Sequence, residues 1–255
     1  MRFSIISVCY NNVLGLKNTL GSLINQSFND WEMIVVDGAS SDTTISFLNS
    51  VSDKRINWRS EPDDSIYHAM NKGTLRATGD YLVYLNAGDI FADRYVLQKL
   101  DAVIQDHYPD FLFGRAIIDQ DITIPPRSVT KELVSDWVIK HEPNHQAIFV
   151  RNAIAKSTKY DEQYRICADL DFKLRLLSNF KWEFVDLDVC RFYLDGVSNV
   201  NSLVKQLEIM NERNRICNLR GYPHHRWSFF RVLTKYLLLK FKFFSVVRFF
   251  RVINK

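Results

Sequence analysis

The sequence predicts an α/β fold in which a mostly parallel sheet is flanked by helices. Over the first 118 residues, short apolar runs alternate with amphipathic helical patterns. Strands joined in this way by helices form parallel sheets with right-handed crossovers. Each apolar run stops at a turn rich in Asn, Asp and Gly, and 255 residues with 47% hydrophobic content suffice for one core.

The first half of the chain supplies the clearest elements. The strands that we expect here are Phe3–Val8, Trp31–Val36, Ile56–Arg59 and Tyr81–Leu85. The helices are expected from Leu14 to Ile24, after Asp42 as a possible N-cap, and across Ile66–Ala77. Tyr81–Leu85 lies in the central stretch GDYLVYLNAGD, and we read it as a strand because the run is only five residues long.

The second half is less regular. The expected strands are Phe111–Ile118, Ile122–Ile124, Ala147–Val150 and Trp182–Leu187, and the expected helices are Val96–Ile104, Asp169–Leu177 and Leu203–Leu219. Gly221-Tyr222-Pro223 then separates a C-terminal tail.

Cysteine usage and charge suggest the compartment. The four cysteines are widely separated without a CxxC pair, which favours a reducing environment. Met1 leads directly into a strand-like run that is too short for a signal peptide, so we expect a cytoplasmic protein. The tail 226–255 carries eight Lys/Arg and no acid, whereas the other 225 residues have a net charge of −4.

Several catalytic classes lack their motifs. The chain contains neither GxGxxG nor GxxxxGK[ST], which argues against a dinucleotide dehydrogenase or a Walker-type NTPase. It also lacks the HExxH motif of zinc metalloproteases and the GxSxG motif of α/β-hydrolases. Carboxylates do follow the strands, at Asp37, at Asp89, and later at Asp169 and Asp171. Such groups suit metal-assisted transfer with a carboxylate base, although Asp is also a common turn and cap residue.

Five motifs occur in a characteristic order. They are FSIISVCYN (3–11), VVDGASSD (35–42), AMNKG (69–73), LNAGD (85–89) and ADLDFKLR (168–175). Over residues 2–190 this order resembles the inverting GT-A glycosyltransferases of family 2. The segments EPDDSIYHAMNKG and NHQAIF most resemble those of the subgroup that builds bacterial O antigens, capsules and exopolysaccharides. The resemblance implies a GT-A fold.

The resemblance also implies roles for individual residues. Asp169 matches the catalytic base, Asp37 the contact to the nucleotide base, and Asp89 the ligand of Mn²⁺ or Mg²⁺. The further nucleotide-sugar contacts that we expect are Tyr10, Asn71, Asn86, His145 and Asp171.

Each role has a plainer alternative. Asn71 could be only a polar residue on a helix face, and His145, beside Gln146, could be a structural histidine. Asp169 and Asp171 stand two residues apart on a helix start and cannot face the same way, so only one of them is the base.

The sequence departs from the family pattern at two places. Asn86 and Gly88 replace carboxylates of the metal motif and leave Asp89 as its acid, which weakens the expected cation site. Ala168 replaces the acid that precedes the base. The loss of a neighbouring negative charge should leave Asp169 more readily ionised.

The implied activity is transfer of a hexose or N-acetylhexosamine from a UDP-sugar to a lipid-diphosphate-linked saccharide, with inversion and with a divalent cation. The alternatives are a GDP-sugar donor, or a non-catalytic nucleotide-sugar-binding protein with a degraded metal motif. We expect a catalytic domain at 1–220, made of a nucleotide-sugar-binding half (1–118) and an acceptor half (119–220).

The tail 221–255 is expected to form a membrane-associating helical segment. Its longest apolar run, Tyr236–Leu239, is far too short to span a bilayer, but Phe, Leu and Val interleaved with Lys and Arg are typical of an interfacial helix. The basic side chains project to both sides, so two shorter helices with a bend fit better than one. We therefore expect peripheral attachment to the inner face of the cytoplasmic membrane and no nucleic-acid partner; the alternative is that the tail packs as ordinary core.

Overall fold

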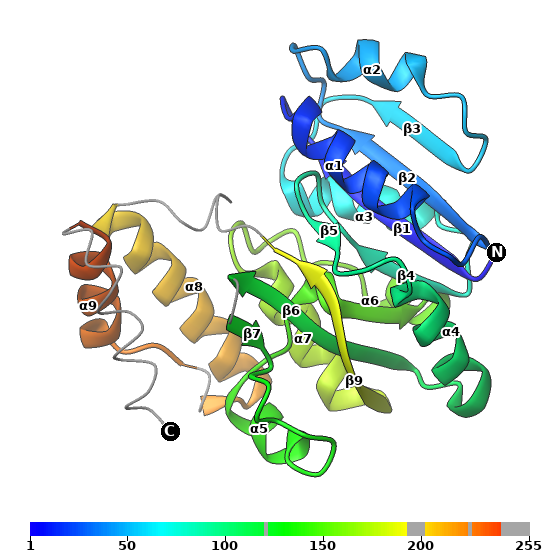
Figure 1. The fold of residues 1–255 in the computed structure, drawn as a ribbon. Helices are drawn as coiled ribbons and strands as arrows, with labels where there is room; N and C mark the ends of the chain where they lie inside the picture. The colour runs from blue at the N-terminus through cyan, green and yellow to red at the C-terminus, as the bar shows by residue number, and fades with distance from the viewer. Residues whose placement is uncertain (120–121, 193–201, 224–225, 241–255) are drawn as a thin grey trace. The chain divides into compact units, whose positions relative to one another are not determined.

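The computed structural model describes residues 1–119, 122–192, 202–223 and 226–240 (Figure 1). The chain divides into two compact units, Met1–Tyr193 and Leu194–Lys255. The predicted division into a catalytic domain ending at residue 220 and a tail stays a prediction.

The first unit is built on one sheet with the strand order β3-β2-β1-β4-β8-β6-β9-β5, and β7 pairs with β6. Its first four strands run parallel, and β8 runs antiparallel to β4. The parallel first half is therefore confirmed, while the second half is mixed. The strands are β1 (Phe3–Cys9), β2 (Trp31–Asp37), β3 (Ile56–Ser60), β4 (Tyr81–Tyr84), β5 (Ile90–Phe91), β6 (Phe111–Asp119), β7 (Ile122–Ile124), β8 (Ile148–Arg151) and β9 (Trp182–Arg191).

Helices cover both faces of this sheet (Figure 1). One face carries α1, α2 and α4, whose apolar side chains share one core cluster, and the other carries α3, α6 and α7. The sequence patterns do not indicate β5, α5 or α6, each seven residues or shorter. The helices of this unit are α1 (Val13–Ile24), α2 (Thr44–Ser50), α3 (Ile66–Arg76), α4 (Val96–His107), α5 (Val134–Lys140), the 3₁₀ turn η1 (His145–Ala147), α6 (Asn152–Thr158) and α7 (Ala168–Asn179).

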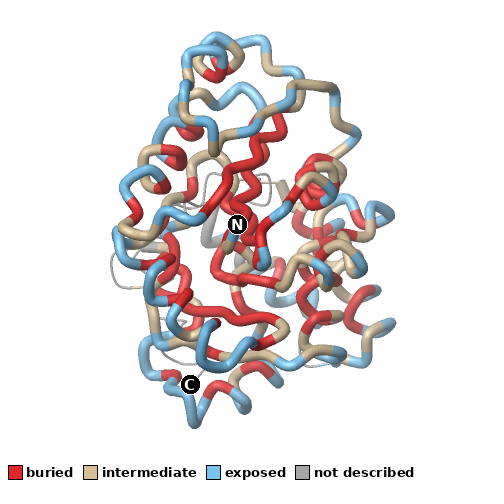
Figure 2. The backbone as a smooth tube through the Cα atoms, turned by 90° about the vertical axis from the view of Figure 1, so that its right-hand side faces the viewer, coloured by how far each residue is buried: buried red, intermediate tan, exposed pale blue. Residues whose placement is uncertain are grey.

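The core follows the central strands. Every residue of β1 and β2 is buried, and the buried stretches run through the middle of the tube in Figure 2. On the face of β1 that carries Ile6, helix α3 comes very close: a Cβ on Gly73 would lie 2.5 Å from Ile6 Cγ2. Close approach of α3 to β1 thus explains the glycine of the AMNKG motif.

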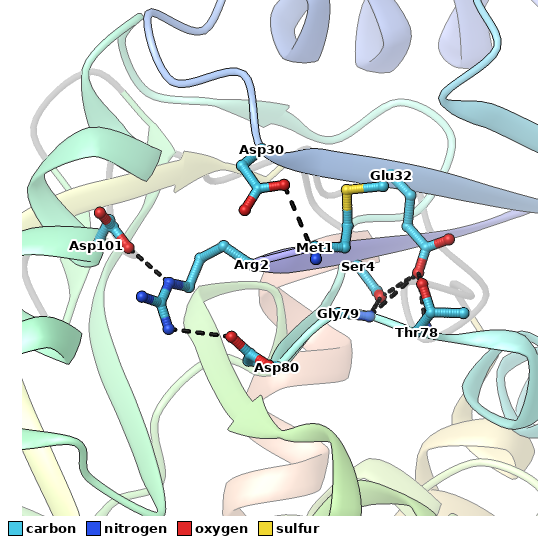
Figure 3. A network of polar contacts seen from close by, with 9 residues as sticks. All are labelled: Met1, Arg2, Ser4, Asp30, Glu32, Thr78, Gly79, Asp80 and Asp101. Atoms are coloured by element: carbon cyan, nitrogen blue, oxygen red, sulfur yellow. Dashed lines mark hydrogen bonds and ion pairs between the residues drawn. The ribbon is translucent and has the colours of Figure 1, made fainter.

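The amino edge of the parallel strands is closed by a polar network (Figure 3). The buried Glu32 carboxylate accepts hydrogen bonds from Ser4 Oγ at 2.6 Å and from the backbone N–H of Thr78 at 2.6 Å. Burial raises the pKa of Glu32, but the hydrogen bonds from Ser4, Thr78 and Gly79 outweigh it and hold the pKa below its usual value. These bonds join β1 and β2 to the turn before β4, so this edge serves the fold.

The second unit contains α8 (Leu203–Arg220) and α9 (Phe229–Lys240). Helix α8 ends at Gly221 in the left-handed conformation, with φ of 76°. The Asn214 side chain bonds Trp227 twice, donating to its carbonyl at 2.9 Å and accepting from its N–H at 2.7 Å. This pair ties the residues before α9 to α8.

Among the described residues, no helix combines the length and the apolar content that a membrane crossing requires. Large apolar side chains are nevertheless exposed on α9, at Phe229, Phe230 and Leu237. Part of the predicted membrane-associating tail, residues 241–255, lies outside the described residues.

Candidate active site at the carboxyl edge of the sheet

The sequence-predicted site residues lie mainly along one edge of the sheet. The carboxyl ends of β1, β2, β3 and β4 meet there, and η1 reaches the same edge because β8 runs antiparallel to β4. In open α/β sheets this edge is where ligands bind.

Asp37 ends β2 and is fully buried. Its carboxylate accepts hydrogen bonds from the backbone N–H of Ser40 at 2.9 Å, from the Ser40 hydroxyl, and from Ser60 Oγ at 2.7 Å. These contacts brace the turn after β2 against β3. Tyr10 is 67% exposed. A Cβ on Gly38 would lie 3.4 Å from Tyr10 Cδ2, so this exposed ring stands over the turn that Asp37 holds.

The starts of α1 and α2 are fixed at the same edge. Asp42 accepts hydrogen bonds from the N–H of Thr44 at 2.9 Å and from the N–H of Val13 at 3.3 Å. The Thr44 hydrogen bonds lower the pKa of the Asp42 carboxyl. The N-cap of α2 is Thr43, so the expectation that Asp42 is the N-cap is wrong by one residue. Asp42 precedes the cap and joins the first residue of α2 to the first residue of α1.

Asn71 is buried on α3 and is already fully engaged. Its amide donates to Tyr160 O at 2.9 Å and to Glu162 Oε1 at 2.7 Å, and accepts from Tyr160 N at 2.9 Å. These bonds fasten the segment before α7 to α3. The expectation that Asn71 contacts the nucleotide sugar stays a prediction.

Helix α1 holds the turn that carries Asp89 through hydrogen bonds of Thr19. The buried Thr19 hydroxyl donates to Asp89 O at 2.7 Å and accepts from Gly88 N at 3.0 Å. Gly88 has φ of 112°, a conformation that favours glycine. The Asp89 side chain is only 7% exposed, and its Oδ2 accepts a hydrogen bond from Gln146 Nε2 at 3.2 Å.

The turn of Asp89 and the adjoining η1 carry oxygen atoms of the kind that a hard cation prefers. No three His, Cys, Asp or Glu side chains come together as a metal-binding group within the described ranges. Asp89 supplies a carboxylate, and two buried amide oxygens, Asn86 Oδ1 and Gln146 Oε1, have no hydrogen-bond partner. Oxygen ligands suit Mg²⁺ and Mn²⁺, which take their remaining ligands from phosphate and water. The residues therefore fit such a cation if a diphosphate completes its shell.

Asp169 lies in the first turn of α7 and is partly exposed. Lys173 Nζ, one helical turn away, donates to Asp169 Oδ2 at 3.0 Å. Tyr67 OH lies 3.3 Å from Asp169 Oδ1 while it donates a shorter bond of 2.6 Å to Ile166 O. His145 Nδ1 is 3.7 Å from Asp169 Oδ2.

The charges around Asp169 keep it ionised. Burial raises the pKa of its carboxyl, but the cation Lys173, its hydrogen bond and the His145 ring outweigh burial and lower the pKa below its ordinary value. Burial lowers the pKa of His145 to about 4, so this ring is neutral at pH 7. Lys173 is thus the positive group that acts on Asp169 near neutral pH.

Asp171 has a different environment. It is fully buried, and its Oδ2 accepts a hydrogen bond from Arg175 Nε at 2.7 Å. Arg175 also donates to the carbonyls of Thr158 and Lys159 at the end of α6. This pairing favours a structural role for Asp171 and Asp169 as the base; the expected contact of Asp171 with the nucleotide sugar stays a prediction.

Two adjacent residues of η1 contact the predicted metal ligand, Asp89, and the predicted base, Asp169. Gln146 contacts Asp89, and His145 faces Asp169. The sequence predicts a site role for His145 but indicates no separate role for Gln146 or Lys173. The i,i+4 spacing of Lys173 from Asp169 is the sequence feature that indicates their contact on a helix. No local signal pairs Gln146 with Asp89, since 57 positions separate them.

Comparison with known proteins identifies the family. Residues 4–178 match the model described as "Glycosyl transferase family 2". A PGL/p-HBAD biosynthesis glycosyltransferase of Mycobacterium bovis (strain BCG / Pasteur 1173P2) is 32% identical over 187 residues, which are 69% of this chain and 70% of the relative. An uncharacterized glycosyltransferase of Methanocaldococcus jannaschii is 24% identical, over 92% of this chain and 88% of the relative.

Solved structures share the fold. S. aureus TarS 1-349 in complex with UDP has a TM-score of 0.64 and 20% identity, over 84% of this chain and 66% of that one. The mannosyltransferase PcManGT from Pyrobaculum calidifontis, in complex with GDP-Man and Mn²⁺, has a TM-score of 0.64 and 13% identity, over 93% of this chain and 69% of that one. These likenesses confirm the predicted GT-A fold.

Proposed function

Because the chain belongs to glycosyl transferase family 2, we propose that it moves a hexose or N-acetylhexosamine from a UDP-sugar to a saccharide acceptor linked to a lipid diphosphate. The reaction inverts the anomeric centre and serves the assembly of a bacterial surface polysaccharide, such as an O antigen, capsule or exopolysaccharide.

The observation that carries the proposal is the pair of carboxylates joined through η1. Asp169 is ionised and partly exposed beside Lys173, while Asp89 is held by Gln146. In the proposed step, Asp169 accepts the proton of the acceptor hydroxyl. The hydroxyl oxygen bonds to the anomeric carbon of the donor as the bond from that carbon to the nucleoside diphosphate breaks. One displacement of this kind inverts the configuration.

The other site residues bind and orient the donor. Asp89 and Asn86 would hold a Mn²⁺ or Mg²⁺ ion, which when bound offsets the negative charge of the leaving diphosphate. Tyr10 offers its exposed ring to the nucleotide base, and Asp37 fixes the adjoining turn or contacts the base directly. His145, neutral beside Asp169, contributes to the sugar or acceptor pocket.

The donor and acceptor are supported by the similar proteins. TarS was crystallised with UDP and with UDP-GlcNAc, which favours a UDP-sugar. The Mycobacterium bovis relative is named for PGL/p-HBAD biosynthesis, which is compatible with an acceptor on a lipid. PcManGT was crystallised with GDP-Man, so a GDP-sugar is the second candidate.

A non-catalytic nucleotide-sugar-binding protein is the remaining alternative. A degraded site would need neither the carboxylate of the metal motif nor that of the base. The presence of both Asp89 and Asp169 at their motif positions therefore supports an enzyme.

We also propose that the second unit attaches the enzyme to the inner face of the cytoplasmic membrane. Phe229 and Phe230 are exposed on α9, and Arg226 and Arg231 lie beside them in the sequence. Aromatic side chains enter the interface, and basic side chains attract anionic lipids at about 1 kcal/mol each.

A donor panel tests the proposed reaction. The full-length protein is incubated with UDP- and GDP-sugars and a synthetic lipid-diphosphate saccharide, and the product linkage is determined by NMR. Transfer from a UDP-hexose or UDP-N-acetylhexosamine with inversion supports the proposal. Transfer with retention, or none from any donor, contradicts it.

A further inference from the structure

We propose that Gln146 completes the cation site of this chain in place of a missing carboxylate. Without the cation, its amide N–H₂ holds Asp89; with the cation, the amide turns and presents Oε1 as a ligand. The inference rests on the proposed function, since it concerns the same cation and diphosphate.

The two polar atoms of the Gln146 amide differ in their hydrogen bonding. The side chain is buried, with 2% of the residue exposed, and Nε2 donates to Asp89 Oδ2 at 3.2 Å. Oε1, on the same amide, is buried without a hydrogen-bond partner. A buried unpaired carbonyl oxygen is unfavourable and calls for an explanation such as an absent ion.

The backbone of Gln146 is fixed, so only its side chain needs to move. Asn144 Oδ1 accepts the N–H of Gln146 at 2.9 Å, and the N–H of Ala147 donates to Asn144 O at 3.0 Å. The terminal torsion of glutamine is broad and roughly two-fold, so exchanging Nε2 for Oε1 is conformationally easy. A positive ion beside Asp89 repels the amide N–H₂ and attracts the amide oxygen, which supplies the reason to turn.

The charge of the site explains why an amide serves here. Asn86 and Gly88 leave Asp89 as the carboxylate of its turn, and Asn86 Oδ1 is a second buried oxygen without a partner. Two neutral amide oxygens and one carboxylate bind a hard cation weakly, because affinity follows the charge of the ligands. The cation should therefore bind mainly together with the nucleoside diphosphate.

Two substitutions of Gln146 separate the roles of its oxygen and its charge. Gln146→Glu adds a carboxylate and should tighten Mn²⁺ binding in the presence of UDP by about 10-fold or more. Gln146→Leu removes the oxygen and should weaken it by roughly 10-fold. The constants are measured by calorimetry and by the electron paramagnetic resonance signal of free Mn²⁺, without any turnover.

Gln105 provides a control at an exposed position. On α4 its Nε2 donates to Asp101 Oδ2 at 2.6 Å, the same amide–carboxylate contact away from the carboxyl edge. Gln105→Glu and Gln105→Leu should leave the Mn²⁺ constant unchanged. Melting curves with and without Mn²⁺ provide a second readout: Mn²⁺ should raise the melting temperature of Gln146→Glu more than that of the wild type.

Asp89→Ala distinguishes the inference from the proposed function. If Asp89→Ala loses the Mn²⁺ effect while both Gln146 variants keep the wild-type constant, the inference is overturned and the cation site stands. If Asp89→Ala binds Mn²⁺ and UDP like the wild type, the proposed cation site itself fails. Should Gln146→Glu fail to fold, the constant of Gln146→Leu alone decides.

Discussion

Lys173 Nζ donates to Asp169 Oδ2 at 3.0 Å from one helical turn further along α7. The lysine is buried, and the nearby His145 ring is neutral at pH 7 because burial lowers its pKa to about 4. A second pair, Asp171 with Arg175, has the same spacing two residues later but is turned toward α6. The helix thus carries one ion pair for the site and one for the fold.

Replacing Lys173 by methionine should move the acid limb of the pH–rate profile to higher pH. Lys173 lowers the pKa of Asp169, and a protonated carboxyl cannot accept the acceptor proton. Without the cation, burial raises the pKa and turnover is lost at a higher pH as the solution is acidified. Lys173→Arg should restore the wild-type limb. An acid limb that Lys173→Met does not move would exclude this role.

Asp171→Asn should act on stability. It leaves the Arg175 guanidinium without its anion, and breaking a buried pair costs about 3–5 kcal/mol. Urea unfolding followed by circular dichroism measures the loss, and Asp169→Asn, at a partly exposed position, should lose less. If Asp171→Asn instead keeps its stability and loses turnover, Asp171 is the base.

Asp89→Ala should abolish nearly all transfer, and excess EDTA should do the same to the wild type. Both remove the charge that offsets the departing diphosphate. Initial rates are compared with and without added Mn²⁺ after chelation. Full activity in excess EDTA would rule out the metal requirement.

The parallel half of the fold could be predicted because its strands are apolar and Asn, Asp and Gly mark its turns. Phe3–Val8, Trp31–Val36 and Ile56–Arg59 are each confirmed, with one residue added at the carboxyl end. The order of β8, β6, β9 and β5 could not be predicted, since long-range pairing rather than local pattern decides it. β5 has only two residues, too few for any periodicity.

The site was predictable as a set of residues more than as a set of contacts. The motif order placed Asp89 and Asp169 in the site, and the structure brings both to η1. What Asn71 contacts could not be foreseen, because its partners Tyr160 and Glu162 are distant in sequence and carry no motif. For Asp37 the partner Ser40 lies in the same motif, whereas Ser60 is 23 positions away. A polar residue in a motif does not reveal whether it faces the ligand or the scaffold.

Deleting residues 226–255 should remove binding to anionic vesicles. Exposed Phe229 and Phe230 would contribute roughly 1.5–3 kcal/mol each if fully buried in lipid, and basic residues add an electrostatic part that salt screens. Co-sedimentation at low and high salt measures this, and the truncated enzyme should keep some activity on a short water-soluble acceptor. If the full-length protein ignores vesicles and truncation unfolds it, the tail is core.

A single-turnover comparison tests most directly whether Asp169 is the base of a glycosyl transfer. Wild type and Asp169→Asn are each saturated with the donor sugar, mixed with acceptor and quenched over time, after calorimetry has measured donor binding. If Asp169 is the base, the two proteins bind the donor with equal affinity and the variant transfers the sugar about 10²–10⁴-fold more slowly. A variant that binds donor normally and transfers the sugar at the wild-type rate would contradict it.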